Sequence, residues 1–85
     1  MNKKLLETIQ TILERFNKLV KDEEEPALQI YFEGSDDPYT FDSDEYMFLS
    51  EDGEFIYSQA NDEGEEICDV VLTKNIEAIL LWPNE

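Results

Sequence analysis

A long amphipathic helix is the sequence feature that most restricts the fold. From Asn2 to Lys21 the apolar residues keep the i, i+3, i+4 spacing of one helix face for about five turns. Asn2 is placed to cap the first turn, and Lys18 and Lys21 suit the negative end of the helix dipole. Pro26 disfavours a helical backbone at the residue before it, so the helix is predicted to end near Lys21. The apolar face consists of Leu5, Leu6, Ile9, Ile12, Leu13, Phe16, Leu19 and Val20.

Short strand patterns follow the helix. Residues 27–33 alternate between apolar and polar side chains, which is typical of a half-buried strand. A turn is predicted at 34–38. Residues 39–41 begin the next strand, which a bulge or turn at 42–44 interrupts before the pattern continues over 45–50. A second turn is predicted at 61–66, and two further strands at 67–73 and 76–82.

Two segments in this region carry more specific signals. Asp52-Gly53 separates two apolar runs and predicts a β-hairpin, with either a two-residue turn or a three-residue loop in which Gly53 is left-handed. The segment Ile79–Trp82 is apolar on both faces, which fits a central strand or an edge strand covered by another subunit. A weak homodimer through this last strand is therefore expected.

These elements predict a single domain over residues 1–85, of the α+β class. The N-terminal amphipathic helix, about residues 2–21, is expected to pack on a four- to five-stranded antiparallel sheet formed by residues 27–82. The alternative is a small closed β-barrel with an N-terminal helix. Cys68, the only cysteine, is expected to be a small buried residue. The expected core comprises Leu28, Ile30, Phe32, Val70, Leu72, Ile76 and Leu80, with Ile9, Ile12, Leu13 and Phe16 from the helix.

The charge distribution is strongly one-sided. From Asp22 to Thr73 the chain has eighteen Asp and Glu residues and no Lys, Arg or His, and the net charge of the whole chain is −16. Residues 1–21 hold five bases and two acids, whereas residues 22–85 hold twenty acids and a single base, Lys74. A segment with one sign of charge creates a field beyond what ordinary solubility needs, and the alternative is a solvated face in which some of the carboxylates serve solubility. The acidic stretch from Asp22 to Thr73 predicts a surface that binds a basic partner. Because the net charge repels phosphate, no direct binding of nucleic acid is expected.

Residues for catalysis and for tight metal binding are scarce. The chain has no histidine and only one cysteine, so no nucleophilic triad, zinc site or cofactor site is predicted, and no enzyme activity is expected. Asp42, Asp44 and Glu45 could offer oxygens to calcium, as could Asp62, Glu63 and Glu65, but neither group follows the calcium-loop pattern. Residues 1–85 show neither a charged-then-apolar pattern at the start nor a long apolar run, so no targeting leader and no membrane span are expected. The expected compartment is the cytoplasm, that of the host cell if the protein is encoded by a phage.

The density of acids is comparable with that of nucleic acid. Duplex DNA carries about one charge per ~1.7 Å, and a compact chain of this length spans roughly 30 Å. A duplex of that length therefore bears roughly 18 charges, and the acidic stretch has eighteen carboxylates. Tyrosines could add amphipathic contacts at such an interface. These are Tyr31, Tyr39, Tyr46 and Tyr57.

In size, acidity, scarcity of bases after Lys21 and α+β pattern, the chain resembles the small acidic nucleic-acid-mimic inhibitors of phages and mobile elements. That group includes anti-restriction, anti-CRISPR and uracil-DNA glycosylase inhibitor proteins. The resemblance implies an inhibitor that blocks the basic groove of a nucleic-acid-binding enzyme such as a phage-defence nuclease. The basic helix would then be a scaffold on the face turned away from the partner.

The expected partner-binding residues are carboxylates held in turns. Six lie at the interruption of the second strand pattern and at the hairpin tip, and four more lie in the second turn. The set is Asp42, Asp44, Glu45, Glu51, Asp52, Glu54, Asp62, Glu63, Glu65 and Glu66. The alternative function is a small bacterial adaptor or regulatory module whose acidic face docks on a basic protein without imitating DNA. A third is a homo-oligomeric structural protein that uses the last strand.

Overall fold

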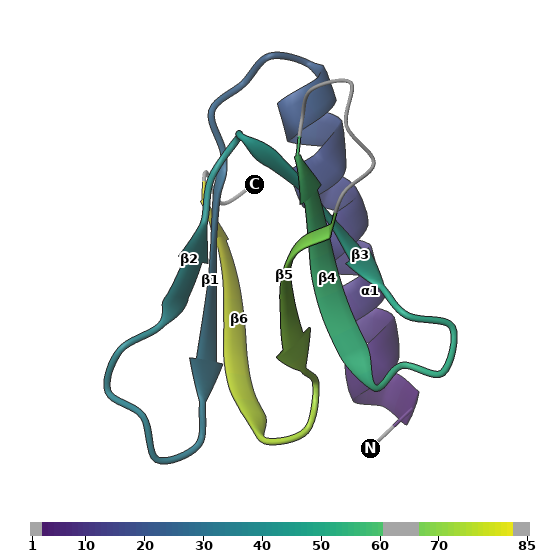
Figure 1. Ribbon diagram of the computed structural model, residues 1–85, viewed down its shortest axis with the longest axis vertical. Helices are drawn as coiled ribbons and strands as arrows, with labels where there is room; N and C mark the ends of the chain where they lie inside the picture. The colour runs from purple at the N-terminus through teal and green to yellow at the C-terminus, as the bar shows by residue number, and fades with distance from the viewer. Residues whose placement is uncertain (1–2, 61–66, 83–85) are drawn as a thin grey trace.

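One helix and six strands make up the described part of the chain. A computed structural model describes residues 3–60 and 67–82. Helix α1 (Lys3–Lys21) is followed by β1 (Ala27–Phe32), β2 (Tyr39–Phe41), β3 (Glu45–Leu49), β4 (Phe55–Ala60), β5 (Ile67–Leu72) and β6 (Ile76–Trp82), as Figure 1 shows. The α+β class is confirmed. The expected span of roughly 30 Å agrees with a longest extent of 32 Å.

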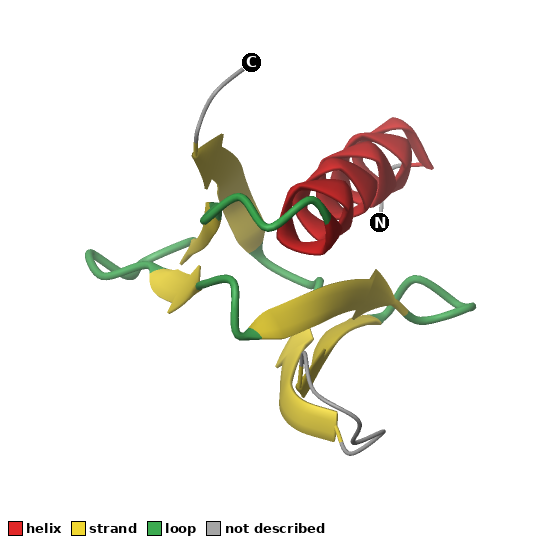
Figure 2. Ribbon diagram, turned by 90° about the horizontal axis from the view of Figure 1, so that it is seen from above, coloured by secondary structure: helices red, strands yellow, loops and turns green. Residues whose placement is uncertain are grey.

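The strands form two antiparallel sheets instead of one. Sheet A has the order β2-β1-β6, and sheet B has the order β3-β4-β5. Figure 2 shows the two sheets meeting at an angle with α1 lying between them, and within the described residues the strands do not close into a barrel. The predicted interruption at 42–44 is a turn in which the Glu45 N–H donates to the Asp42 carbonyl oxygen (3.3 Å). The chain changes sheets there and again at 73–75.

The helix ends as expected, through a specific backbone motif. The N–H of Glu24 donates to the carbonyl of Leu19 (3.0 Å), and the N–H of Glu23 donates to that of Val20 (3.1 Å). Glu23 has a φ of 63°, the left-handed conformation that this Schellman arrangement requires and that glycine usually supplies. The acidic segment after the helix is thus turned away from the helix axis and leads directly into β1.

The core lies between the helix and the inner faces of both sheets. It contains most of the expected helix and β1 residues together with residues from β2, β3 and β4 that the pattern did not single out. Ile12 and Phe32 are only partly buried at its margin. The buried residues are Ile9, Leu13, Phe16, Val20, Leu28, Ile30, Phe41, Met47, Ile56, Val71 and Ile76.

Four expected core residues are exposed. Val71 is the β5 residue that faces Ile56 in the core, so its neighbours Val70 and Leu72 point to solvent and are 55% and 53% exposed. Leu80 pairs with Gln29 on the outer face of sheet A and is 52% exposed. Cys68 lies opposite the register shift between β4 and β5 and is also exposed. These four predictions are wrong because the inner positions in these parts of both strands differ by one residue from those expected, and successive side chains of a strand point to opposite faces.

The hairpin between β3 and β4 is longer than either predicted form. Residues 50–54 connect the strands, and the Gly53 N–H donates to the Ser50 carbonyl (2.9 Å). Gly53 has a φ of 76°, which confirms its left-handed conformation. A β-carbon at this position would lie 3.0 Å from Cδ1 of Leu6, so the absence of a side chain also lets the start of α1 approach the loop.

β6 has the predicted bounds and lies at an edge of sheet A, not in its centre. Its inner side chains Ile79 and Leu81 oppose Ile30 and Leu28 of β1. Its outer side chains Leu80 and Trp82 are largely exposed, and Trp82 is 70% exposed. The edge position agrees with one of the two alternatives, and coverage of this strand by another subunit stays a prediction.

Candidate functional site: an apolar sheet face between acidic turns

The side of sheet B that faces away from α1 is uncharged and largely apolar. Strand registers place cross-strand partners on the same face, and Met47 and Ser58 mark the inner one because both are buried. The intervening positions form the outer face of sheet B. It consists of Tyr46, Phe48 and Ser50 from the β3 side, Phe55, Tyr57 and Gln59 from β4, and Ile67, Val70 and Leu72 from β5. None of these side chains is charged.

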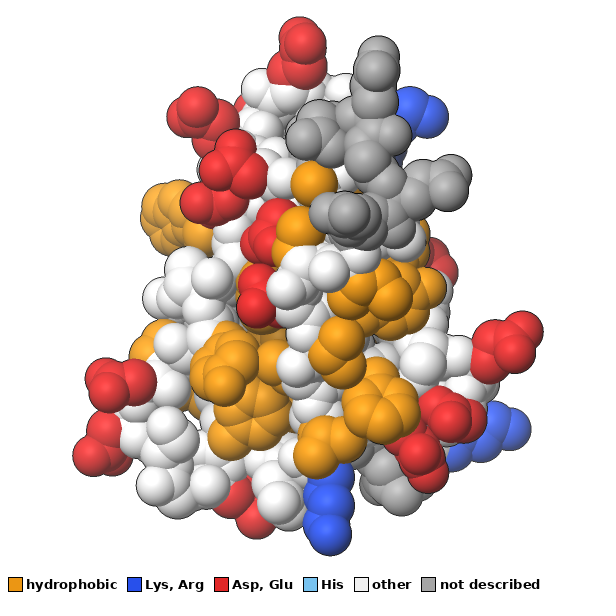
Figure 3. All heavy atoms as spheres, in the orientation of Figure 1, with side chains coloured by type: hydrophobic (Ala, Val, Ile, Leu, Met, Phe, Trp, Pro, Cys, Tyr) orange, Lys and Arg blue, Asp and Glu red, His pale blue; other side chains and the backbone are white. Residues whose placement is uncertain are grey.

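Solvent reaches much of this outer face. Ile67 is 56% exposed and Phe55 37%, while Val70 and Leu72 are each more than half exposed. The rings of Phe48 and Tyr57 pack across β3 and β4 with centroids 5.5 Å apart. In Figure 3 hydrophobic side chains gather over β4 and β5, with acidic side chains below and beside them. Exposed apolar side chains grouped on one sheet face are typical of an interaction surface.

Six predicted binding residues lie at the two ends of β3. Asp42, Asp44 and Glu45 lie at its start, and Glu51, Asp52 and Glu54 lie in the loop after its end. The rise of a strand separates the two groups by roughly 20 Å. Asp62, Glu63, Glu65 and Glu66 lie outside the described residues. The six carboxylates therefore form two acidic turns rather than one continuous cluster, and Tyr46 and Phe48 lie between them on the outer face.

The first acidic turn is held by hydrogen bonds. The Asp44 N–H donates to Oδ1 of Asp42 (3.0 Å), and both side chains are exposed. Glu45 is half-buried, and its Oε1 accepts a hydrogen bond from the Ser58 hydroxyl (3.0 Å). That hydroxyl is fully buried and also accepts from the Asp69 N–H (3.1 Å). Glu45 thus links β3, β4 and β5, so part of its bonding capacity serves the fold.

The second acidic turn is organised by Asp52. Its Oδ1 accepts from the Ser50 hydroxyl (2.7 Å) and from the Glu54 N–H (3.0 Å). The backbone N–H of Glu54 and then the Ser50 hydroxyl hold the pKa of Asp52 below its usual value, because both stabilise the ionised form. The loop is also tied to the end of β5, where the Thr73 hydroxyl donates to the Gly53 carbonyl (2.6 Å). This turn presents its charge on a well-fixed backbone.

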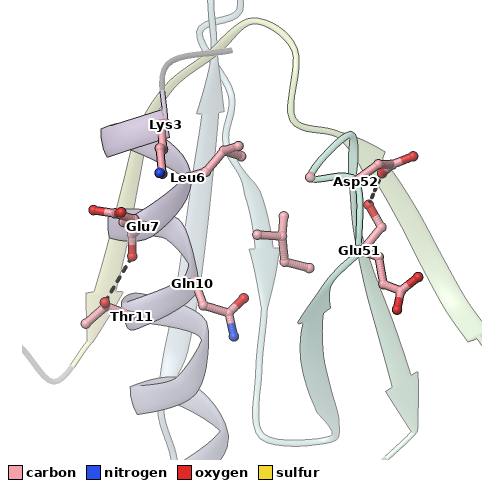
Figure 4. A pocket seen from close by; sticks show the side chains of 10 residues that line it. Lys3, Leu6, Glu7, Gln10, Thr11, Glu51 and Asp52 are labelled. Atoms are coloured by element: carbon pink, nitrogen blue, oxygen red, sulfur yellow. Dashed lines mark hydrogen bonds between the residues drawn. The ribbon is translucent and has the colours of Figure 1, made fainter.

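Two grooves adjoin the second acidic turn. One, of about 420 Å³, lies between the first half of α1 and the loop, with Lys3 and Gln10 on the helix side and Glu51 and Asp52 on the loop side, as Figure 4 shows. The other, of about 790 Å³, lies between the start of α1 and the β5–β6 connection and includes Glu33 and Lys74. Over residues 3–60 and 67–82, no three acidic or cysteine side chains are grouped to hold a metal ion. Nor does any buried side-chain polar atom in that part lack a partner.

The outer face of sheet B was not predicted from the sequence. A signal was present in Tyr46-Met47-Phe48-Leu49 and in Val70-Val71-Leu72, where neighbouring residues are all apolar, so both faces of each strand must be apolar. Of the four tyrosines considered as anchors, Tyr46 and Tyr57 lie on this face. Tyr31 lies on the outer face of sheet A, and Tyr39 packs edge-on against Phe32.

Comparison of the chain with protein-family models, with curated protein sequences and with solved structures finds no match. No helix in the described part of the chain is long and apolar enough to cross a membrane. The two acidic turns and the outer face of sheet B between them are the structural features that bear on function.

Proposed function

We propose that this protein is an acidic protein-binding module that docks on a basic protein partner and has no catalytic role. The observation that carries the proposal is the outer face of sheet B, an uncharged and partly exposed surface with an acidic turn at each end of β3. Protein interfaces commonly have a core depleted in charge and a polar rim. The apolar face would supply buried contact area, and the acidic turns would steer a basic partner into place.

A more specific form of this function is inhibition by nucleic-acid mimicry. Two features favour it: the excess of acids from Asp22 to Thr73 and the hydrogen bonds that fix Asp42 and Asp52 in their turns. In this form the acidic turns enter the basic groove of a nucleic-acid-binding enzyme, such as a phage-defence nuclease, and exclude its substrate. The adaptor form needs only a basic docking surface on the partner.

Capture from a bacterial lysate tests the general proposal and separates its two forms. Replacing Asp42, Asp44, Glu45, Glu51, Asp52 and Glu54 by their amides should weaken capture of the partner, and added salt should slow it. The matched control is a set of acid-to-amide changes elsewhere, at Glu7, Glu14, Glu23, Glu24, Glu25 and Glu77. Unchanged capture of the partner after the six substitutions in the acidic turns would contradict a role for these turns. Competition by added duplex DNA supports mimicry, and its absence supports the adaptor.

We also propose weak self-association through β6. Leu80 and Trp82 are the most exposed apolar residues of this edge strand, and with Gln29 and Tyr31 they lie on an uncharged part of sheet A. Packing of these faces in two copies would bring uncharged side chains together. Sedimentation at several concentrations should show a dimer that Leu80→Ser with Trp82→Ser abolishes. A concentration-independent monomer contradicts the proposal.

A further inference from the structure

The two edges of sheet B differ in how they are protected. At the β3 edge the side chain of Asn17 bonds to the backbone N–H and carbonyl of Met47, and α1 packs alongside. At the β5 edge no strand among residues 3–60 and 67–82 pairs on the side away from β4. Exposed strand edges invite pairing with another chain, and proteins usually protect them with Lys, Pro or a covering element. β5 contains neither Lys nor Pro.

The free edge of β5 can be assigned to individual residues. The Thr73 N–H donates to the Glu54 carbonyl (2.9 Å), and the register continues through Leu72 opposite Phe55 and Val71 opposite Ile56. In an antiparallel pair the bonded and non-bonded positions alternate. Val71 is therefore bonded to β4, whereas Val70 and Leu72 direct their N–H and carbonyl groups away from it. The register shift next to Cys68 limits the regular edge to residues 69–72.

The side chains along this edge alternate in character. Val70 and Leu72 lie on the outer face and are more than half exposed. Asp69 pairs with Ser58 and lies on the opposite side of the strand, where it is also exposed. An added strand would therefore meet apolar side chains on one of its faces and a carboxylate on the other.

The charge of Asp69 indicates which kind of segment would pair with the β5 edge. In a second copy the one charged residue of β5 would be another Asp69, and no lysine or arginine in that strand could face the first Asp69. A basic partner would bring the complementary charge. Self-pairing through β5 is thus disfavoured relative to pairing with a basic segment.

We propose that β5 binds an extended basic segment of the partner protein as a fourth strand of sheet B. The backbone of Val70 and Leu72 would form the new ladder, the segment's apolar side chains would extend the outer face, and a Lys or Arg on its other face would lie near Asp69. In this mode the main chain supplies affinity and alternate side chains supply specificity. The inference rests on the proposed function and adds the way in which the partner is recognised.

A synthetic peptide of alternating Lys and Val tests this inference on the intact protein. Hydrogen exchange measured by NMR should show the amides of Val70 and Leu72 slowed at least several-fold by the peptide, while that of Met47, already bonded to Asn17, is unchanged. Two N-methylated peptides, methylated at all Lys or at all Val amides, are the backbone controls, and one of them should lose binding. A Glu–Val peptide should not bind, and Asp69→Asn should weaken binding of the Lys–Val peptide several-fold.

Three results would overturn the inference. The first is protection outside β5 only, or none at saturating peptide. The second is equal binding by both N-methylated peptides, which would indicate attraction of charge without strand pairing. The third is protection of Val70 and Leu72 that rises with protein concentration in the absence of peptide, which would assign the edge to a second copy. If lysate capture still depends on the acidic turns in these cases, the proposed function stands and only the strand-pairing mode fails.

Discussion

The side-chain amide of Asn17 bonds twice to the backbone of Met47: Nδ2 donates to the carbonyl oxygen at 2.7 Å, and Oδ1 accepts from the N–H at 2.8 Å. This pair of bonds repeats the pattern that a neighbouring strand would make with an edge residue. A helix residue thus takes the place of a strand along β3. The arrangement joins α1 to sheet B and leaves β5 as the open edge of that sheet in the described part of the chain.

Replacement of Asn17 by Ala is expected to lower the free energy of unfolding by about 1–3 kcal/mol, because the N–H and carbonyl of Met47 lose their partners. Urea denaturation measures the change. Gln10→Ala on the exposed face of the same helix is the control, and its effect should stay within about 0.5 kcal/mol. Equal effects of the two substitutions would show that the Asn17 bonds contribute little.

Two large apolar residues that the sequence placed together in the core should respond differently to truncation. Phe16 is fully buried, and Phe16→Ala should cost about 3–5 kcal/mol, enough to unfold so small a domain. Leu80→Ala removes an exposed side chain and should cost at most about 0.5 kcal/mol. Thermal melting of both variants checks this. A small loss of stability at Phe16 would contradict the packing of the helix. A large loss at Leu80 would mean that β6 turns this side chain toward the core.

The sequence predicted the elements better than their assembly. The helix was predicted well because its apolar spacing is regular and because Lys21 and Pro26 mark its end. The bounds of β6 were predicted well because Lys74-Asn75 and Pro83 flank it. The two sheets were not predicted, because each change of sheet occurs at a short turn whose residues are compatible with a hairpin in a single sheet. Strand pairing depends on contacts between distant segments, which local patterns do not encode.

The candidate site was predicted only in its acidic part. Carboxylates at 42–45 and 51–54 are visible in the sequence because charge needs no register to be counted. The apolar face can be identified only when the strand register is known. In Val70-Val71-Leu72 every residue is apolar, so the sequence pattern does not show which side chain points inward. The pairing of Val71 with Ile56 resolves this, and it places Val70 and Leu72 on the outer face of sheet B.

Alanine at Gly53 is expected to destabilise the protein more than alanine at Gly34. Both glycines have left-handed φ values, 76° and 80°, and a side chain in that conformation costs roughly 1–2 kcal/mol. Only at Gly53 does the new β-carbon meet another group, Leu6. The excess cost at Gly53 should therefore diminish in a Leu6→Ala background, measured by a double-mutant cycle in urea. The same excess in both backgrounds would contradict the contact.

The stabilising contribution of Asp52 should depend on pH. Its folded-state pKa is lowered by the Glu54 N–H and the Ser50 hydroxyl, so the contribution is present above the ordinary Asp pKa of about 3.9 and is lost as the pH falls through the lower folded value. The stability of the wild type relative to Asp52→Asn should therefore decline on acidification from about pH 5 to pH 2. The other carboxylates are common to both proteins and largely cancel in this difference. A difference that is constant or that grows on acidification would contradict the prediction.

The most direct test of the binding-module account compares the two uncharged sheet faces. The dissociation constant of the captured partner is measured for the wild type, for Phe55→Ser with Val70→Ser on the outer face of sheet B, and for Leu80→Ser with Trp82→Ser on that of sheet A. The four side chains are 37% to 70% exposed, so the fold should survive in each variant. We predict binding that is roughly tenfold or more weaker for the sheet B variant and within about threefold of wild type for the sheet A variant. Wild-type affinity in the sheet B variant, or a larger loss in the sheet A variant, would contradict the account.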